Sequence, residues 1–372
     1  MPFFSPEDIE GIINEFRYVL EGKGLLTKGP IVENFEKCFA EYVGTKYAVA
    51  VNSGTSALDV VLKSIGIGEG DEVIIPVQTF IATGSCVNIN GGTPVFCGIN
   101  ENYLLDYEDL KEKITYKTKA VIIVHFGGLI NSQIFEIRDY LKQKNIYLIE
   151  DAAHAHGARI DEAYAGALGD FGCFSFYSTK IMTTAGEGGM ITTNNKDHFD
   201  LCRSFSNRGM DPHAGYEIFS NVGNNYKMTE IQAIVGQYQL RRLNDFVEHR
   251  NKIAEIYKAE LKDFEMKGLI RFQQAPKKVR NAYWRFVIVL DGARCEREEI
   301  KVEMGKAGIN IDWPYQPLIH LQPVYKKLYG IEDGYLRWSE EYAKHHFCLP
   351  IHLGINENDA IYIAGKLKEV IK

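Results

Sequence analysis

The sequence predicts an α/β fold in which a mostly parallel central sheet is covered by helices. Short apolar runs alternate with helix-like stretches through the first two-thirds of the chain, a pattern typical of a sheet covered on both faces. The 372 residues exceed the size of one ordinary hydrophobic core, which favours two domains. A content of 45% hydrophobic and 24% charged residues is typical of a soluble globular protein.

The elements of this fold can be assigned along the chain. Strands are expected at residues 47–51, 72–75, 94–97, 120–124, 147–149, 172–176 and 190–193. Residues 228–261 form a long helical pattern that is expected to lead into a second domain. A strand within 283–290 and a helix over 296–307 then indicate a smaller α+β domain. We therefore expect a large domain over residues 1–250, including an N-terminal helix, and a small C-terminal domain over residues 251–372.

Charge and cysteine usage argue against several kinds of partner. The net charge of −7 argues against nucleic-acid binding, which usually requires a strongly basic face. The N-terminus lacks the pattern of a secretory signal, and no apolar run approaches the ~20 residues of a membrane span. The seven cysteines are scattered without the paired spacing of disulfides or zinc sites. We expect a cytoplasmic protein with no metal ion, no nucleic acid and no membrane partner.

Two ionisable residues follow strand-like runs, where open α/β sheets bind their ligands. The apolar run 146–149 stops at Glu150-Asp151, and Lys180 ends the run 174–180 before a glycine-rich stretch. Taken alone, Asp151 could cap a helix and Lys180 could be a solvated strand end. Together they match pyridoxal phosphate, which forms a Schiff base with a lysine and needs an aspartate facing its ring nitrogen. We assign Lys180 to the aldehyde carbon and Asp151 to that nitrogen.

A third segment has the arrangement of a phosphate cradle. Residues 51–58 follow a predicted strand and open a helical pattern in Leu58, Val61, Leu62 and Ile65. Free N–H groups and the dipole at the start of a helix favour a phosphate group. The alternative interpretation is that these small polar residues only cap the helix.

With these pieces in place, the chain resembles the DegT/StrS-type aminotransferases. These are fold-type-I pyridoxal-phosphate enzymes that place amino groups on nucleotide-linked keto sugars. The resemblance runs from residues 27–32 to Leu349-Pro350. The matching motifs are Ser53-Gly54-Thr55-Ser56-Ala57-Leu58, Thr79-Phe80-Ile81-Ala82-Thr83, Glu150-Asp151-Ala152-Ala153-His154-Ala155-His156-Gly157, Gly169-Asp170, Phe174-Ser175-Phe176 through Lys180, Gly186-Glu187-Gly188-Gly189 and Asn225-Tyr226-Lys227-Met228.

The resemblance implies a role for individual residues toward the cofactor. Gly54 and Thr55 are expected to hold its phosphate, Ser175 to add a hydroxyl, and Phe80 to stack on its pyridine ring. The position of Asn225 reaches the phosphate of the neighbouring subunit in relatives, which implies a homodimer with shared active sites.

Two positions depart from the family pattern. His154 replaces a common glutamine near the ring oxygen or ring face of the cofactor, and it adds a titratable group there. Lys227 replaces a common arginine, so a bidentate contact becomes a single ammonium contact.

The resemblance also implies a reaction, in which an amino group moves from L-glutamate to a keto sugar. A nucleotide-linked 3-keto or 4-keto deoxyhexose is the preferred acceptor, and cyclitols or other keto sugars are alternatives. Sugar dehydratases of the family carry histidine in place of the lysine, and a non-catalytic regulator would be expected to lose Lys180, Asp151 or the cradle. Further residues in segments that could line a sugar or nucleotide pocket are His125, Arg208, Trp284, Tyr315 and His320.

Overall fold

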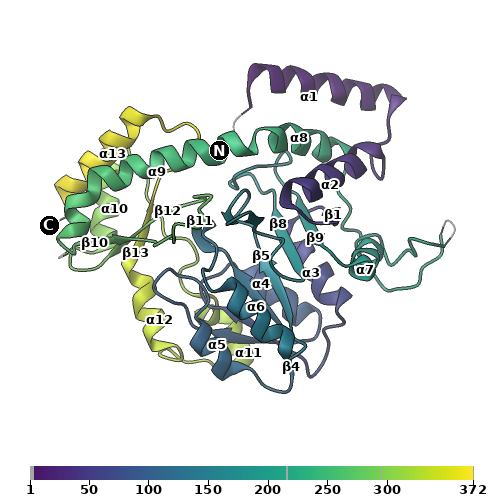
Figure 1. The fold of residues 1–372 in the computed structure, drawn as a ribbon, viewed down its shortest axis with the longest axis horizontal. Helices are drawn as coiled ribbons and strands as arrows, with labels where there is room; N and C mark the ends of the chain where they lie inside the picture. The colour runs from purple at the N-terminus through teal and green to yellow at the C-terminus, as the bar shows by residue number, and fades with distance from the viewer. Residues whose placement is uncertain (1–3, 215–216, 294, 372) are drawn as a thin grey trace.

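The computed structural model describes residues 4–214, 217–293 and 295–371 (Figure 1). Its main feature is a seven-stranded sheet with the order β1-β9-β8-β5-β4-β2-β3. The strands are β1 (Tyr47–Val51), β2 (Glu72–Pro76), β3 (Thr93–Cys97), β4 (Thr118–Val124), β5 (Tyr147–Asp151), β8 (Phe171–Ser175) and β9 (Gly189–Thr193). Neighbours are parallel except where β9 pairs with β1 and β8. The predicted α/β fold is confirmed.

Helices cover both faces of this sheet. Successive residues of a strand point to opposite faces, and Val73, Ile74 and Ile75 of β2 are all fully buried. The covering helices and their neighbours are α1 (Pro6–Tyr18), α2 (Pro30–Val43), α3 (Gly54–Ser64), α4 (Ile81–Ile89), α5 (Tyr107–Lys113), α6 (Ile134–Gln143) and α7 (Lys196–Ser206). Helix α1 packs on α8 (Glu230–Arg241) through Ile12, Ile234 and Val235, and Figure 1 shows it on the outside of the molecule.

The long helical pattern over 228–261 is two helices rather than one. Helix α8 ends at Arg241, and α9 (Leu243–Met266) begins after Arg242, whose φ of −105° and ψ of 1° leave the helical region. The Arg242 side chain pairs with Asp8 of α1 at 2.8 Å, a contact that sequence periodicity cannot reveal. Helix α9 runs through residue 250 without a break. The domain boundary expected at that residue stays a prediction.

A second sheet lies in the C-terminal part of the chain. Its antiparallel order is β10-β12-β13, from β10 (Ile270–Phe272), β12 (Phe286–Leu290) and β13 (His346–Leu349). These strands share a second core with α9, α10 (Arg297–Lys306) and α13 (Glu357–Val370). The strand expected within 283–290 begins only at Phe286, since Tyr283 has a positive φ of 48°.

Residues 313–345 leave this second sheet and pack against the ends of β2 and β3. Ile319 N donates a hydrogen bond to Val77 O at 3.1 Å. The Gln78 side-chain amide donates to Pro314 O at 2.9 Å. The segment contains α11 (Pro323–Tyr329) and α12 (Arg337–Tyr342). Among the helices that the structure describes, none is both long and apolar enough to cross a membrane.

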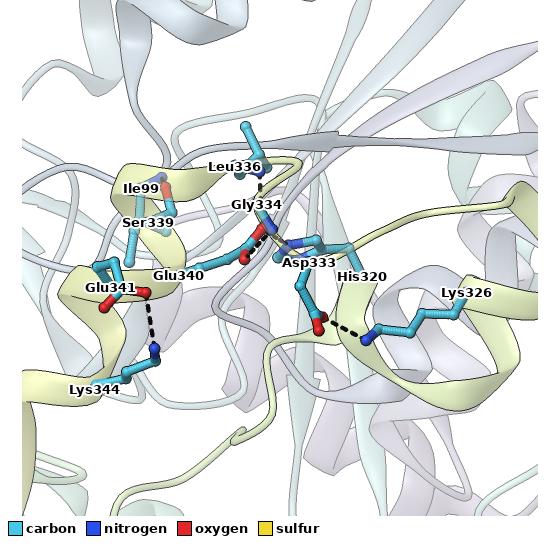
Figure 2. A network of polar contacts seen from close by, with 10 residues as sticks. All are labelled: Ile99, His320, Lys326, Asp333, Gly334, Leu336, Ser339, Glu340, Glu341 and Lys344. Atoms are coloured by element: carbon cyan, nitrogen blue, oxygen red, sulfur yellow. Dashed lines mark hydrogen bonds and ion pairs between the residues drawn. The ribbon is translucent and has the colours of Figure 1, made fainter.

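Glu340 organises the interior of this segment (Figure 2). Its carboxylate accepts hydrogen bonds from the His320 ring at 3.1 Å, Gly334 N at 2.7 Å and Leu336 N at 2.9 Å. The neighbouring Ser339 accepts a bond from Ile99 N at 3.1 Å, which ties α12 to the chain after β3. This network holds the segment, which includes Tyr315, in place beside the main sheet.

Candidate active site

A cavity of about 450 Å³ opens at the carboxyl ends of the parallel strands. It is lined by Ser53, Gly54, Thr55, Leu58, Thr79, Phe80, Ala82, Thr83, Val124, Asp151, Ala153, His154, Cys173, Ser175, Tyr177, Thr179, Lys180, Glu187, Trp284 and Tyr315. These residues lie in or after the carboxyl ends of β1, β2, β4, β5 and β8, in the loop before β9, or in the C-terminal part of the chain. Seven of the eight site residues predicted from the sequence lie here, and Asn225 does not.

The first turn of α3 forms one wall of the cavity. Ser53 is the N-cap, and its hydroxyl accepts a hydrogen bond from Ser56 N at 3.0 Å. The N–H groups of Gly54 and Thr55 come before any carbonyl of the helix that could accept them, so they are available to an anion. A Cβ at Gly54 would lie 2.7 Å from the Cβ of Ser175. Glycine is therefore required for α3 to start directly against the end of β8.

Asp151 is the last residue of β5, and its carboxylate is buried in the cavity wall. It accepts hydrogen bonds from Ala153 N and from the Thr83 hydroxyl, both at 3.2 Å. Burial raises the pKa of Asp151 above its ordinary value, and the nearby Lys180 ammonium opposes this shift. The structure thus maintains a buried carboxylate that a cationic partner would stabilise.

Glu150 precedes Asp151 but has a different function in the fold. Because side chains alternate along a strand, it points away from the cavity. Its fully buried carboxylate accepts hydrogen bonds from His125 Nε2 at 2.9 Å, and from the N–H groups of Gly166, Leu168 and Gly169 at 2.8, 2.7 and 2.7 Å. Glu150 and His125 therefore fix the loop before β8, and His125 does not line the cavity.

Lys180 lies on a tight loop between β8 and β9. The loop is closed by backbone hydrogen bonds from Phe176 N to Gly188 O at 2.8 Å and from Ser178 N to Gly186 O at 3.0 Å. Gly186 has a φ of 125°, and a Cβ at Gly188 would lie 2.0 Å from the Thr184 hydroxyl. The glycine-rich stretch after Lys180 is thus needed to close the loop that carries the lysine.

The surroundings of the Lys180 amine favour its neutral form. Desolvation lowers its pKa from 10.5 to about 8, with Arg285 adding to the shift and Asp151 opposing it. The ammonium lies 4.5 Å from the ring centre of Trp284, a cation–π distance. The Trp284 Nε1 donates to the carbonyl of Thr179 at 2.9 Å, which fixes the indole beside the lysine.

His154 completes an aromatic wall together with Trp284 and Tyr315. Its ring stacks on the Trp284 indole at 3.6 Å, and its Nε2 shares a hydrogen bond of 2.7 Å with the Tyr315 hydroxyl. Burial is the main cause that lowers the pKa of His154 well below its ordinary value, so the imidazole is neutral at physiological pH. Phe80 is 53% exposed at the mouth of the cavity, with its ring 6.0 Å from that of Tyr315.

The remaining sequence candidates lie outside this cavity. Asn225 is exposed, and its side-chain oxygen accepts a hydrogen bond from the Lys227 ammonium. His320 is buried against Glu340, and Arg208 is exposed with a positive φ of 62°. Trp284 and Tyr315, in contrast, contact the central residues of the site. Thr83 was not predicted as a site residue, although it ends the motif that begins at Thr79. Its hydrogen bond to Asp151 depends on how α4 is placed against β5, which the sequence does not reveal.

A lysine, a buried aspartate and a helix N-terminus in one cavity are the groups that pyridoxal phosphate requires. The sequence profile described as the DegT/DnrJ/EryC1/StrS aminotransferase family matches residues 6–368. The chain belongs to this family. It is therefore an aminotransferase, and its cofactor is pyridoxal 5′-phosphate.

Individual relatives resemble the chain over almost its full length. The GDP-perosamine synthase of Escherichia coli O157:H7 is 34% identical over 94% of this chain and 93% of its own. The aminotransferase of Psychrobacter cryohalolentis superposes with a TM-score of 0.92 at 28% identity, covering 99% of this chain and 97% of its own. A protein of Streptococcus pneumoniae described as a sugar aminotransferase, in its PMP form, gives a TM-score of 0.89 at 28% identity, covering 99% and 97%.

Proposed function

We propose that this aminotransferase moves an amino group from L-glutamate to a nucleotide-linked keto sugar, a 3-keto or 4-keto deoxyhexose. The observation that carries this proposal is the common cavity of Lys180, Asp151 and the first turn of α3. The similarity to a GDP-perosamine synthase over almost the full length supports a nucleotide-linked acceptor.

The chain offers complementary groups to each part of the cofactor. The N–H groups of Gly54 and Thr55 and the Ser175 hydroxyl are proposed to hold its phosphate, because a helix N-terminus favours an anion. Asp151 is proposed to face the ring nitrogen, where a protonated nitrogen would compensate the cost of the buried carboxylate. Phe80 is proposed to lie on the ring face. When bound, the cofactor supplies an electron sink for the bonds around the reacting carbon.

Lys180 is proposed to move the proton in both halves of the reaction. Its amine must be neutral to accept a proton from the substrate carbon and charged to deliver one to the cofactor. A pKa of about 8 makes both forms accessible near neutral pH. The Trp284 indole beside the amine stabilises the charged form without adding a group that competes for the proton.

Lys180 also bears on the alternative reactions. The sugar dehydratases of this family carry histidine in its place, so a lysine here favours amino transfer. A regulator without catalytic activity would have no need to keep Lys180, Asp151 and the cradle in one cavity. The similarity to a GDP-perosamine synthase favours a nucleotide-linked acceptor over cyclitols and other keto sugars.

We further propose a homodimer that shares its active sites, cytoplasmic in location. Asn225 is exposed and outside its own cavity, so it is free to reach a neighbouring subunit. Exposed apolar side chains flank it, with Phe219 at 51% and Val222 at 88% exposure. Leu26, 60% exposed, is joined to the same region because its carbonyl accepts a hydrogen bond from Glu230 N. Such clustered apolar side chains are typical of a protein interface.

The test is to incubate the enzyme with L-glutamate and a panel of nucleotide-linked 3-keto and 4-keto sugars. Mass detection should find an amino sugar from at least one acceptor, together with 2-oxoglutarate. A Lys180→Ala enzyme is the matched control and should form none over repeated turnovers. If the cofactor-loaded enzyme aminates no nucleotide-linked acceptor but does aminate a free keto sugar or a cyclitol, the proposed substrate class is wrong.

A further inference from the structure

A second cavity of about 410 Å³ lies beside the active site. It is lined by Thr179, Arg250, Trp284, Arg285, Gly308, Ile309, Asn310, Asp312, Cys348, Leu349, Pro350, Ile351, His352, Ile355 and Ile363. Thr179 and Trp284 belong to the walls of both cavities, so the two are neighbours across the Trp284 indole. Two guanidinium groups and one carboxylate therefore line a space next to the reacting lysine.

The protein satisfies the two arginines of this cavity only in part. Arg250 is only 4% exposed, and its Nη1 donates to the carbonyls of Tyr283 and Ile351 at 2.9 and 2.8 Å. Arg285 pairs with Asp312 at 3.0 Å. The buried Nε of each arginine has no hydrogen-bond partner among the described residues. Two guanidinium groups against the single carboxylate of Asp312 leave an excess of positive charge in the lining, so the cavity favours an anion.

Arg285 is also electrostatically linked to the reacting amine. Its guanidinium lies 4.3 Å from a ring centre of Trp284, while the Lys180 ammonium lies 4.5 Å from one. Arg285 is one of the causes that lower the pKa of Lys180, after the larger effect of desolvation. An anion bound to Arg285 would reduce this repulsion and favour the charged form of Lys180.

We propose that the second cavity is an anion subsite of the active site, where Arg285 and Arg250 bind an anionic oxygen group of a substrate. This proposal rests on the proposed function, in which both substrates are anions. The group is either a carboxylate of the amino donor or the diphosphate of the nucleotide-linked sugar. Both present the oxygen acceptors that a guanidinium binds through two parallel hydrogen bonds.

Arg285→Gln tests this proposal, and Arg280→Gln is its matched control. Arg280 lies five residues earlier and also forms an ion pair, with Glu248 at 2.8 Å. Its side chain is 29% exposed, close to the 27% of Arg285, but it does not line the cavity. Calorimetry on the cofactor-loaded enzymes would use two kinds of probe. Glutarate has the two carboxylates of the donor without its amino group, whereas GDP, UDP and dTDP have the diphosphate.

Arg285→Gln should weaken the binding of at least one kind of probe by about ten-fold or more, and Arg280→Gln should not. A loss for glutarate alone assigns the subsite to the donor, and a loss for the nucleotides alone assigns it to the sugar carrier. A loss for both means that the two substrates use the subsite in turn. Arg285→Lys keeps the charge beside Asp312 and should show a smaller loss, so it remains informative if Arg285→Gln is unstable.

Equal binding by wild type and Arg285→Gln would overturn the proposal, as would equal losses in the two Gln variants. Failure of the wild type to bind any probe would overturn it too. Because binding is measured without turnover, the subsite and the proposed function can fail separately. Intact anion binding with no amino transfer to any acceptor would contradict the function but leave the subsite standing.

Discussion

The imidazole of His154 lies flat against the indole of Trp284, with ring centres 3.6 Å apart and 12° between the planes. His154 follows β5 of the main sheet, whereas Trp284 precedes β12 of the second sheet. The indole also contacts the Lys180 ammonium and donates to Thr179 O. A residue from the C-terminal part of the chain therefore holds the segment that carries the Lys180 amine.

Covalent attachment of pyridoxal phosphate to the apoenzyme should depend on pH through Lys180. Only the neutral amine attacks the aldehyde, and desolvation lowers the pKa of Lys180 to about 8. The rate should therefore rise as the pH increases toward 8 and level off above it. Stopped-flow absorbance after mixing apoenzyme with the cofactor gives this profile. A midpoint near the ordinary lysine value of 10.5 would contradict a desolvated amine.

Replacing Trp284 with leucine should shift that profile to lower pH. The aromatic face stabilises the charged amine, so its loss favours the neutral form. We also expect a fall in kcat of about 30-fold, because stacking and cation–π contacts each contribute on the order of 1 kcal/mol, about 2 kcal/mol together. Trp284→Phe keeps an aromatic face and should retain the wild-type midpoint more closely. Identical profiles for wild type and Trp284→Leu would mean that the indole does not act on the lysine.

Lys180→Ala should abolish repeated turnover while the protein stays folded. The cradle at Gly54 and Thr55 and the carboxylate of Asp151 remain, so much of the affinity for the cofactor should persist. Steady-state assays, with thermal unfolding as the control for folding, check this expectation. Normal turnover by the variant would show that another group moves the proton.

Asp151→Asn should lower the activity of the enzyme but raise the stability of the apoprotein. Loss of the carboxylate removes the charge that is proposed to face the ring nitrogen, at a cost of about 3 kcal/mol in transition-state stabilisation, or roughly 100-fold in kcat. The apoprotein should instead become more stable at neutral pH. Burial raises the pKa of Asp151, so its charged form opposes folding.

The pH dependence of that stability gain follows from the direction of the shift. The gain should grow as the pH rises through the window between the unfolded pKa, about 3.9, and the raised folded pKa. It should shrink as the pH falls toward 4. Thermal unfolding of both apoproteins between pH 4 and 7 measures it. A variant less stable than wild type at pH 7 would show that the Lys180 partner outweighs burial.

A shared active site should allow complementation between two inactive variants. If Asn225 serves the partner's cavity, a mixed dimer of Asn225→Ala and Lys180→Ala has one site without either lesion. Mixing the two proteins and allowing subunits to exchange should restore about a quarter of wild-type activity, and about half if only mixed dimers form. Proven mixed dimers without recovered activity would place Asn225 outside the active site.

The sequence predicts the strands of the main sheet within two residues at each end, because runs such as Tyr47–Val51 are continuous and apolar. Lys180, Asp151 and Gly54 could be proposed for the same reason, since their types and places after strands are local signals. The reversed direction of β9 between β1 and β8 has no such signal. The structure also shows which residues meet across long separations in the chain.

Trp284 and Tyr315 illustrate what local patterns cannot supply. They lie more than 100 residues after Lys180, and nothing in their own segments distinguishes them from packing residues. Tyr315 reaches His154 only because residues 313–345 return to β2, where Ile319 N bonds Val77 O. The break at Arg242 depends in the same way on a distant partner, Asp8.

The cavity takes its walls from Ser53 through to Tyr315, so a ligand that fills it binds only a chain folded at both ends of that span. By mass action, saturation at 100 times the dissociation constant adds about 2.7 kcal/mol to the free energy of unfolding. The population of opened chains, and with it cleavage by proteases, then falls about 100-fold. Saturation with the cofactor should therefore lengthen the lifetime of the chain in the presence of a protease.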